Sequence, residues 1–222
     1  TCAINCRYCF RRHFPYEDNR LGSDDFARIQ TYLLDQPEVN EVILSGGDPL
    51  VISNARLSAL LDLIEAVPHI SRLRIHTRLP VVIPQRVDQG LLQRLGESRL
   101  NCVLVTHCNH PQELDADFDL AMNLLKRQGV TLLNQAVLLR GVNDAVATQV
   151  ALGERLFSAG VLPYYLHLLD PVAGAHHFDV PEAEARTLMA GVHAALPGFL
   201  IPRLVREVPG QPGKTLIDLQ LP

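Results

Sequence analysis

Five short apolar runs alternate with amphipathic stretches, and this alternation constrains the fold of the 222-residue chain more than any other feature. Between the runs, apolar residues recur at i, i+3, i+4 and i+7, the period of a helix with one buried face. Leu57 to Ile64 and Phe118 to Leu125 are two such stretches. The runs at which we expect strands are residues 41–45, 73–77, 101–106, 131–137 and 162–168. The pattern predicts an α/β fold, in which helices cover a parallel sheet that is either open or closed into a barrel.

Four residues mark where these helices are expected to begin and end. Asp24 and Ser53 are candidate N-caps, because their side-chain oxygens can accept hydrogen bonds from the first helical turn. Gly129 and Gly160 each follow a helical pattern, at the position where a left-handed residue commonly ends a helix. No repeat, low-complexity segment or linker divides the chain, so we expect a single domain over residues 1–222.

Charge and hydropathy exclude two classes of partner. A net charge of −4 gives no electrostatic footprint for nucleic acid. No apolar run approaches the ~18 residues that a membrane-spanning helix needs. We therefore expect a cytoplasmic enzyme with no nucleic-acid or membrane partner. The chain starts at a threonine inside a motif, so we also expect the full protein to have an additional N-terminal region.

Three cysteines, Cys2, Cys6 and Cys9, have the spacing C-x3-C-x2-C. A structural zinc site needs four protein ligands, whereas a cubane iron–sulfur cluster can be held by three thiolates with one iron left open. Half of a zinc knuckle is the alternative interpretation. A disulfide framework is disfavoured, because five cysteines are an odd number and the chain is long enough to bury a core. Cys102 and Cys108 are interpreted as ordinary buried or partly buried thiols.

Polar residues follow the expected strands, where the ligands of parallel α/β barrels bind. Ser45-Gly-Gly-Asp48 follows the first strand, His107 follows the third, and Gln135 lies within the fourth. The fifth leads to Asp170, and a last loop rich in glycine and proline runs from Arg206 to Lys214. Each has a structural alternative: a tight turn, a histidine satisfied within the fold, or a solvated loop lysine. Their combination favours a polar active site at the strand ends.

Taken together, these segments resemble a known family. The cysteine spacing followed by Ser45-Gly-Gly-Asp-Pro49 is similar to the radical S-adenosylmethionine (SAM) superfamily, and more narrowly the chain resembles the lysine 2,3-aminomutases from Cys2 to Lys214. The motifs that carry this likeness are Cys6-Arg-Tyr-Cys-Phe-Arg-Arg-His13, Leu44-Ser-Gly-Gly-Asp-Pro-Leu50, Leu133-Asn-Gln-Ala-Val-Leu-Leu-Arg-Gly-Val-Asn-Asp144, Pro163-Tyr-Tyr165 with Asp170, and Pro209-Gly-x-x-Gly-Lys214. The resemblance implies a partial (β/α)6 TIM-like barrel of the radical SAM type, with its first strand just before Thr1.

The resemblance also implies a reaction. In that family a reduced [4Fe–4S] cluster bound to SAM generates a 5′-deoxyadenosyl radical, which removes a hydrogen from C3 of lysine. The substrate amine is held as an imine to pyridoxal 5′-phosphate (PLP), whose π-system lets the nitrogen migrate. The chain is thus expected to be an isomerase that converts L-α-lysine to (R)-β-lysine. It would use a [4Fe–4S] cluster, SAM, PLP and an external one-electron reductant.

Two sets of residues match the family's cofactor sites. Cys2, Cys6 and Cys9 match the cluster ligands. Lys214, in a C-terminal loop at about residues 206–222, matches the lysine that forms a Schiff base with PLP. The positions that match SAM contacts are Ser45, Gly46, Gly47, Asp48, His107 and Gln135.

Three further residues match the substrate site. Arg11 corresponds to the arginine that pairs bidentately with the α-carboxylate of lysine. Asp170 corresponds to one of two acidic residues that receive the ε-ammonium. Glu207 stands where the family has the second aspartate, which keeps the charge but adds a methylene.

The family has two branches, one acting on free lysine and the other supplying (R)-β-lysine for attachment to elongation factor P. The free-lysine enzymes carry further cysteines beyond the PLP loop, whereas this chain reaches Pro222 without any, and Phe10-Arg-Arg-His-Phe-Pro-Tyr16 looks more like the elongation-factor branch. We therefore expect the second branch. A PLP-independent radical SAM enzyme, in which Lys214 has no role, and a non-enzymatic iron–sulfur or zinc module are the alternatives. A homo-oligomer is compatible with each.

Overall fold

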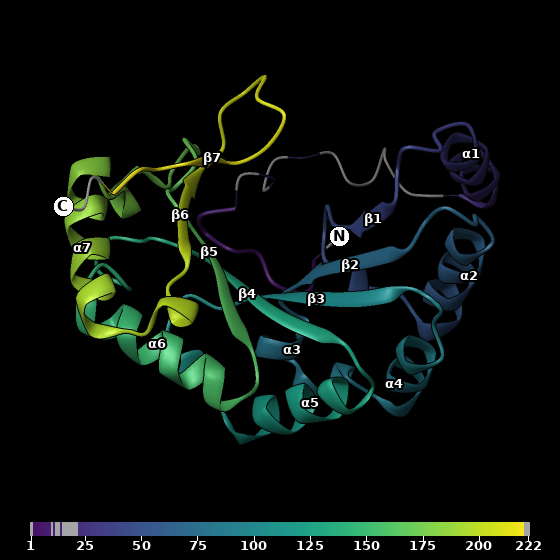
Figure 1. The fold of residues 1–222 in the computed structure, drawn as a ribbon, viewed down its shortest axis with the longest axis horizontal. Helices are drawn as coiled ribbons and strands as arrows, with labels where there is room; N and C mark the ends of the chain where they lie inside the picture. The colour runs from purple at the N-terminus through teal and green to yellow at the C-terminus, as the bar shows by residue number, and fades with distance from the viewer. Residues whose placement is uncertain (1, 10, 12–13, 15–21, 220–222) are drawn as a thin grey trace.

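A curved parallel sheet organises the computed structural model, which describes residues 2–9, 11, 14 and 22–219. Six parallel strands follow one another across the sheet in chain order, and a seventh joins the edge antiparallel to the sixth. The strands are β1 (Glu41–Leu44), β2 (Arg72–Thr77), β3 (Asn101–His107), β4 (Thr131–Val137), β5 (Leu162–His167), β6 (Arg203–Arg206) and β7 (Thr215–Leu216). Figure 1 shows the sheet curled like part of a barrel. The expected partial α/β barrel is confirmed.

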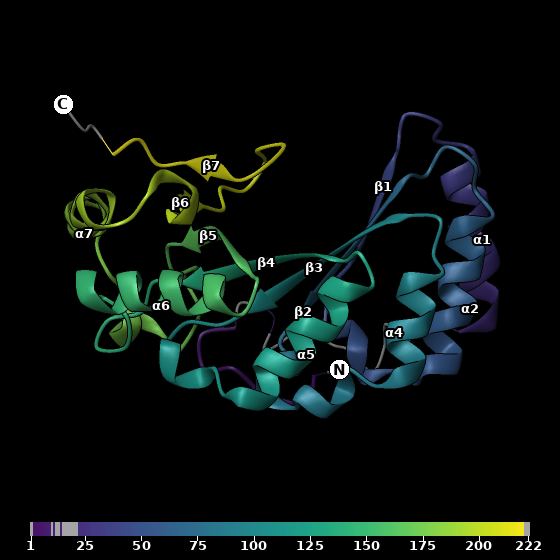
Figure 2. The ribbon, with the colours of Figure 1, turned by 60° about the horizontal axis from the view of Figure 1, so that its bottom comes forward.

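Helices connect the parallel strands and lie outside the curve of the sheet in both ribbon views (Figures 1 and 2). The α-helices are α1 (Ser23–Leu34), α2 (Asn54–Glu65), α3 (Leu79–Val82), α4 (Gln89–Gly96), α5 (Ala116–Arg127), α6 (Val146–Ser158) and α7 (Glu182–Ala195). Short 3-10 turns are η1 (Pro49–Val51), η2 (Pro84–Arg86), η3 (Pro111–Glu113), η4 (His176–Phe178) and η5 (Gly198–Leu200). The turns η1 and η3 come a few residues after the ends of β1 and β3, so they help to shape the strand-end face of the sheet.

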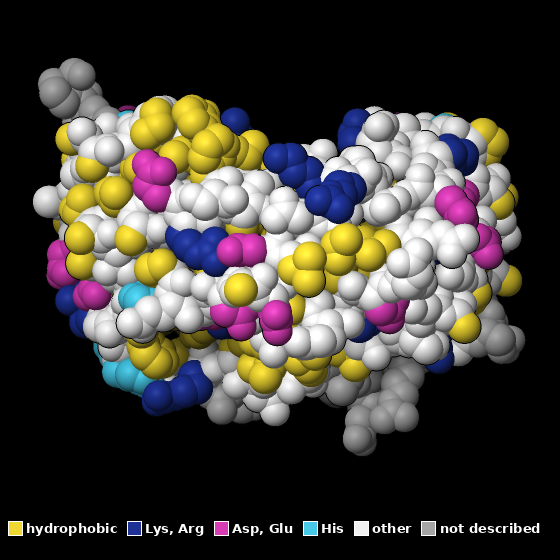
Figure 3. Space-filling model, turned by 90° about the horizontal axis from the view of Figure 1, so that it is seen from below, with side chains coloured by type: hydrophobic (Ala, Val, Ile, Leu, Met, Phe, Trp, Pro, Cys, Tyr) yellow, Lys and Arg dark blue, Asp and Glu magenta, His cyan; other side chains and the backbone are white. Residues whose placement is uncertain are grey.

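The core lies between the sheet and these helices. The predicted apolar faces of α2 and α5 are buried, and Leu61, Ile64 and Phe118 are fully inaccessible to solvent. Each such side chain stabilises the fold by about 1.5–3 kcal/mol relative to exposure. On the side where α5 and α6 lie, Figure 3 shows basic and acidic side chains interspersed, as expected for the solvent faces of amphipathic helices. Cys102 and Cys108 are both buried, as expected.

The five predicted strands are confirmed, with bounds that differ by at most one residue. The strands β6 and β7 were missed, and the two residues of β7 are too few for a periodic pattern to stand out. Ser53 caps α2 by accepting a hydrogen bond from Arg56 N at 3.4 Å. Gly129 and Gly160 have φ of 79° and 81°, as predicted for helix C-termini.

The prediction for Asp24 is wrong. Helix α1 already begins at Ser23, and its N-cap is Gly22. The Asp25 carboxylate reaches back and accepts a hydrogen bond from Gly22 N at 2.7 Å. An acidic residue inside the first turn therefore satisfies the helix start in place of a capping side chain at Asp24.

Among the residues that the structure describes, no helix has both the length and the apolar character required to cross a lipid bilayer.

Candidate active site

A cavity of about 420 Å³ opens at the carboxyl ends of the parallel strands. Every residue that the sequence analysis assigned to a site lines this one cavity. These residues are Cys2, Cys6, Cys9, Arg11, Ser45, Gly46, Gly47, Asp48, His107, Gln135, Asp170, Glu207 and Lys214. They come from segments spread over almost the whole chain, and the parallel order of the sheet brings them together.

The three N-terminal cysteines are free thiols of intermediate exposure on the cavity wall. Burial raises the pKa of Cys2, and a backbone hydrogen bond from Asp48 opposes that rise. Within the described residues, no three His, Cys, Asp or Glu side chains converge on a single metal ion. A cubane cluster does not need such convergence, because each thiolate binds a different iron. Three thiols on one wall are therefore compatible with such a cluster.

The glycine turn after β1 is built for close approach. Gly46 has φ of 120°, a conformation that L side chains rarely adopt, and a Cβ there would lie 3.4 Å from Arg11 Nη1. The Asp48 carboxylate accepts hydrogen bonds from Leu50 N, Thr77 Oγ1, Arg78 N and Leu79 N, at 2.7 to 3.2 Å. These bonds use all four of its lone-pair positions. The turn therefore offers backbone groups to a ligand, while the Asp48 side chain ties the turn to the end of β2.

Neutral histidines line the cavity at the ends of β2, β3 and β5. His107 and Gln135 are register partners on β3 and β4, and Gln135 Nε2 lies 2.6 Å from His107 Nε2. Burial, with neighbouring positive groups, lowers the pKa of His107 to about 3 and the pKa values of His76 and His167 to about 4. His76 Nε2, His167 Nε2 and Gln135 Oε1 are buried and find no hydrogen-bond partner among the residues that the structure describes. Such atoms call for a polar ligand, since buried polar groups are nearly always paired.

Lys214 lies among acidic and aromatic groups on the wall formed by β5 and β6. Its Nζ is 2.6 Å from Glu207 Oε1 and 5.8 Å from the centroid of the Tyr165 ring. Burial and the charge of Glu207 raise the pKa of Asp170, while Lys214 opposes that rise. Glu207 pairs with the Lys214 ammonium and Asp170 lies within its electrostatic range, so two carboxylates face one cation and the surplus negative charge favours a second cation at this end.

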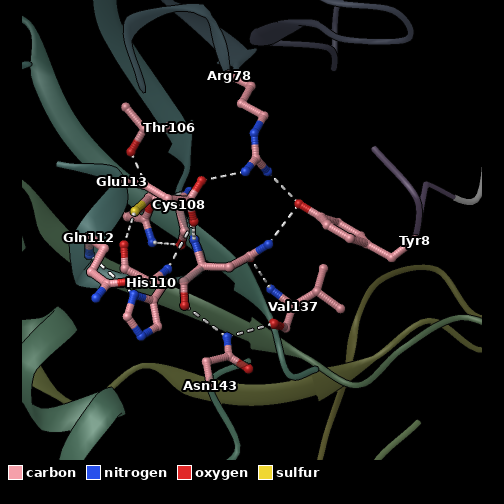
Figure 4. A network of polar contacts seen from close by, with 11 residues as sticks. Tyr8, Arg78, Thr106, Cys108, His110, Gln112, Glu113, Val137 and Asn143 are labelled. Atoms are coloured by element: carbon pink, nitrogen blue, oxygen red, sulfur yellow. Dashed lines mark hydrogen bonds and ion pairs between the residues drawn. The ribbon is translucent and has the colours of Figure 1, made fainter. Parts of the chain in front are cut away.

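A polar network that the sequence analysis missed joins the cysteine loop to the strand ends (Figure 4). The Tyr8 hydroxyl accepts hydrogen bonds from Arg78 Nη1 and Asn109 Nδ2, and Arg78 is ion-paired with Glu113. The only sequence signal was the place of Tyr8 between Cys6 and Cys9. His76 and His167 were also left without a role, although both lie next to the last residue of an expected strand.

Comparison with known proteins agrees with this geometry. Residues 1–74 match the model of a family described as a 4Fe-4S single cluster domain. Over 99% of its length the chain is 51% identical to the L-lysine 2,3-aminomutase of Escherichia coli strain K12. It is 50% identical to that of Haemophilus influenzae over 97% of its length, and 36% identical to that of Clostridium subterminale over 96%. The chain is thus similar over almost its whole length to proteins named L-lysine 2,3-aminomutase.

The chain spans 64% of the length of the Escherichia coli relative and 51% of the Clostridium subterminale relative. Among solved structures it is similar to a radical SAM methyltransferase from Sphaerobacter thermophilus, with a TM-score of 0.60 over 82% of this chain and 56% of that one. Identity there is 15%, so this likeness concerns the fold alone. The resemblance predicted from the motifs is thus confirmed for the family and for the fold, and it supports the expected cofactor set.

Proposed function

We propose that this chain is the catalytic core of an L-lysine 2,3-aminomutase, an isomerase that converts L-α-lysine to (R)-β-lysine. The observation that carries the proposal is the meeting of thirteen family-matched residues on one cavity, in a chain 51% identical to a protein of that name. The position of Lys214 on the same cavity as the three cysteines supports this proposal over a zinc module or a PLP-independent enzyme.

The cavity residues fit three cofactors. Cys2, Cys6 and Cys9 would hold a [4Fe–4S] cluster, and the glycine turn with His107 and Gln135 would bind SAM. Lys214 would hold PLP covalently. When bound, the cluster with SAM supplies a radical that removes hydrogen, and PLP supplies a π-system that delocalises the unpaired electron.

Charge would orient the substrate. The Arg11 guanidinium suits a carboxylate, because its planar fork can donate two parallel hydrogen bonds. Asp170 and Glu207 would receive the ε-ammonium, since their negative charge exceeds the single charge of Lys214 beside them. The histidines between these ends are neutral, so they add hydrogen-bonding capacity without repelling the substrate ammonium.

The finer part of the proposal is the branch: the product would be attached to elongation factor P. Its support comes from the sequence alone, and most of the motif from Phe10 to Tyr16 lies outside the described residues. A coupled assay decides it. The product should be a substrate for enzymatic attachment to a lysine of elongation factor P, and deletion of this protein should leave that factor without the β-lysyl group. An unchanged modification state would assign the enzyme to free-lysine metabolism.

The reaction itself is tested with the full-length protein, reconstituted anaerobically with iron, sulfide, PLP and a reductant. We expect about four iron and four sulfide per chain, and SAM-dependent formation of β-lysine measured by mass spectrometry. Stoichiometric zinc without sulfide would support the zinc module. SAM cleavage without β-lysine or bound PLP would support the PLP-independent alternative.

The PLP site has a built-in control, because the chain contains two lysines, Lys126 and Lys214. Lys126 is exposed on α5, outside the cavity. Borohydride reduction should fix a pyridoxyl group on the peptide that contains Lys214 and leave the Lys126 peptide unlabelled. Label on Lys126 alone, or on neither lysine, would contradict the assignment.

A further inference from the structure

The cysteine loop, residues 2–9, has little apolar burial of its own. Ala3, Ile4 and Asn5 are exposed, and Ile4 retains 43% of its surface. A backbone hydrogen bond of 3.1 Å from Cys9 N to Cys6 O forms a turn within the loop. Apolar burial this limited cannot hold the three thiols in place, so polar contacts must provide most of the stabilisation of the loop.

Tyr8 provides two of these contacts. Its ring projects from between Cys6 and Cys9, and its hydroxyl oxygen accepts from Asn109 Nδ2 at 2.7 Å and from Arg78 Nη1 (Figure 4). Both lone pairs of the phenol oxygen are thereby used. Arg78 also lines the cavity, so the attachment point lies beside the site itself.

The partners of Tyr8 are themselves held by the strand ends. Asn109 is 4% exposed, and its Oδ1 accepts from Val137 N at 2.9 Å, which ties it to the end of β4. Its backbone carbonyl accepts from Asn143 Nδ2 at 2.9 Å. Glu113, the ion partner of Arg78, accepts from Asn109 N at 2.7 Å. Each group that contacts Tyr8 is thus fixed by at least one further bond, and the network does not depend on a bound ligand.

We propose that the Tyr8 hydroxyl is a positioning group: it holds the cysteine loop on the ends of β2 to β4 and so fixes the cluster relative to His107 and Gln135. The proposal rests on the proposed function in one respect, namely that the three cysteines bind a cluster. Arg7 anchors the other side of the loop, with Nη2 3.2 Å from His177 Nε2 and its guanidinium 5.1 Å from the Phe178 ring centroid. Because of this second anchor, loss of the Tyr8 hydroxyl should loosen the loop without preventing cluster assembly.

The test compares Tyr8→Phe with Tyr32→Phe, in full-length protein reconstituted anaerobically. Tyr32 lies on α1 with 61% of its surface exposed, so it is a matched loss of one hydroxyl away from the loop. Tyr8→Phe leaves two buried donors unpaired, and we expect iron release to a chelator to accelerate about tenfold. The electron paramagnetic resonance signal of the reduced cluster with SAM should broaden or shift, which a purely global loss of stability would not cause. Tyr32→Phe should match the unmodified protein in both measurements.

A second variant avoids touching the loop at all. Arg78→Lys keeps the charge, but an ammonium cannot span Tyr8 and Glu113 as the guanidinium fork does. It should also accelerate iron release and alter the same signal. If neither variant folds, hydrogen exchange of the unmodified protein without cluster decides, because a preformed attachment predicts slow exchange at the Cys9 amide.

The outcomes separate the two proposals. If the unmodified protein assembles no iron–sulfur cluster, the proposed function is wrong. If it does, but Tyr8→Phe and Arg78→Lys release iron and give spectra like Tyr32→Phe, or the Cys9 amide exchanges at the rate of an unstructured peptide, the role of Tyr8 is wrong while the function stands.

Discussion

The two ends of the cavity are held in different ways. At the cysteine end, Tyr8 is tied to Arg78 and Asn109, which belong to a partly buried network rooted in the strand ends. At the other end, Lys214 is held by an ion pair with Glu207 in which the side chains are 28% and 48% exposed. An exposed pair of this kind contributes about 0–1 kcal/mol. The cysteine end is therefore positioned by the fold, while the lysine end depends on what binds there.

The local backbone shows the same contrast. Residues 209–213 are all exposed, and the loop that they form projects from the molecule between β6 and β7 (Figure 1). Only two register pairs join those strands. Segments with few buried contacts open at low free energy, which suits a loop that we propose admits a cofactor and a substrate. The following experiments test whether chemistry at the lysine end can be lost while the cysteine end stays intact.

Lys214→Ala should have the largest effect. Removing the amine that would hold PLP is expected to lower β-lysine formation on the order of 10³-fold or more, as for other groups that act as a catalytic unit. The cluster spectrum and slow SAM cleavage without lysine should remain, because the cysteine end is supported separately. Lys126→Ala is the control and should keep full activity. Retained activity in Lys214→Ala would show that the two ends do not cooperate in one reaction.

Asp170→Asn should come next. The variant removes one of two carboxylates proposed to receive a buried ammonium, and we expect a loss of about 2–5 kcal/mol in transition-state stabilisation, measured as kcat/KM for lysine. The cluster signal should be unchanged. Asp62→Asn, an exposed carboxylate paired with Arg94 outside the cavity, is the control. Equal kcat/KM in Asp170→Asn and the unmodified protein would place the ε-amine elsewhere.

At pH 7 the same variant, Asp170→Asn, should raise the stability of the folded protein although it lowers the activity. Burial and Glu207 raise the pKa of Asp170, so the folded state favours its protonated form. The stability that this group contributes is present at low pH and is lost as the pH rises through its folded pKa. At pH 7 the ionised carboxylate is a cost, and Asp170→Asn should raise the melting temperature there but not at pH 3. Such a cost to the fold would be typical of a residue with the binding role that we propose for Asp170.

Sequence reasoning succeeded where one strand or one motif held the information. The alternating pattern predicted five strands, and the motifs predicted the residues that line one cavity, because a parallel sheet places all strand ends on one edge. It failed for the Tyr8 network, which joins residues 70 and 101 positions apart. Pairings at such separation have no periodic signature along the chain.

It also could not foresee how Asp48 is used. The motif predicted a SAM contact, whereas the carboxylate accepts four hydrogen bonds from its own chain. Whether a motif residue faces a ligand with its side chain or with its backbone depends on local geometry, which spacing alone does not specify. The same limit applied to Asp24, because the contact at the start of helix α1 comes from the carboxylate of Asp25.

Acidification should lower the stability of the folded protein through the three histidines that lie between the two ends of the cavity. His76, His107 and His167 have pKa values lowered to about 4, 3 and 4, so they remain neutral in the folded protein while the unfolded chain takes up protons below about pH 6.5. Because the folded pKa is depressed, stability is full above the ordinary histidine range and is lost as the pH falls towards 4. Each histidine adds a slope of at most ~1.4 kcal/mol per pH unit. Denaturant unfolding between pH 7 and pH 5 measures the total.

Glutamine in place of His107 cannot take up a proton. The difference in proton uptake between the unfolded and folded states should therefore fall by about one proton, and the free energy of unfolding should depend less on pH. His193→Gln, on the outer helix α7, should leave it unchanged. An equal slope in the two variants would mean that the cavity histidines are not the groups that make the folded protein sensitive to acid.

Glu207→Asp should have the smallest effect and is the most specific test of the lysine end. The change restores the residue expected from the family and draws the carboxylate back by one methylene. The ion pair with Lys214, 2.6 Å long, would weaken, but its exposure limits the cost to about 0–1 kcal/mol of stability. Turnover of lysine should be kept or raised, because the carboxylate remains available for the ε-ammonium and competes less for Lys214. The matched control is Glu184→Asp, an exposed glutamate paired with Arg140 at 3.0 Å outside the cavity. A fall in kcat/KM of tenfold or more with Glu207→Asp alone would show that this end of the cavity is fixed to the longer side chain, and that it is as firmly positioned as the cysteine end.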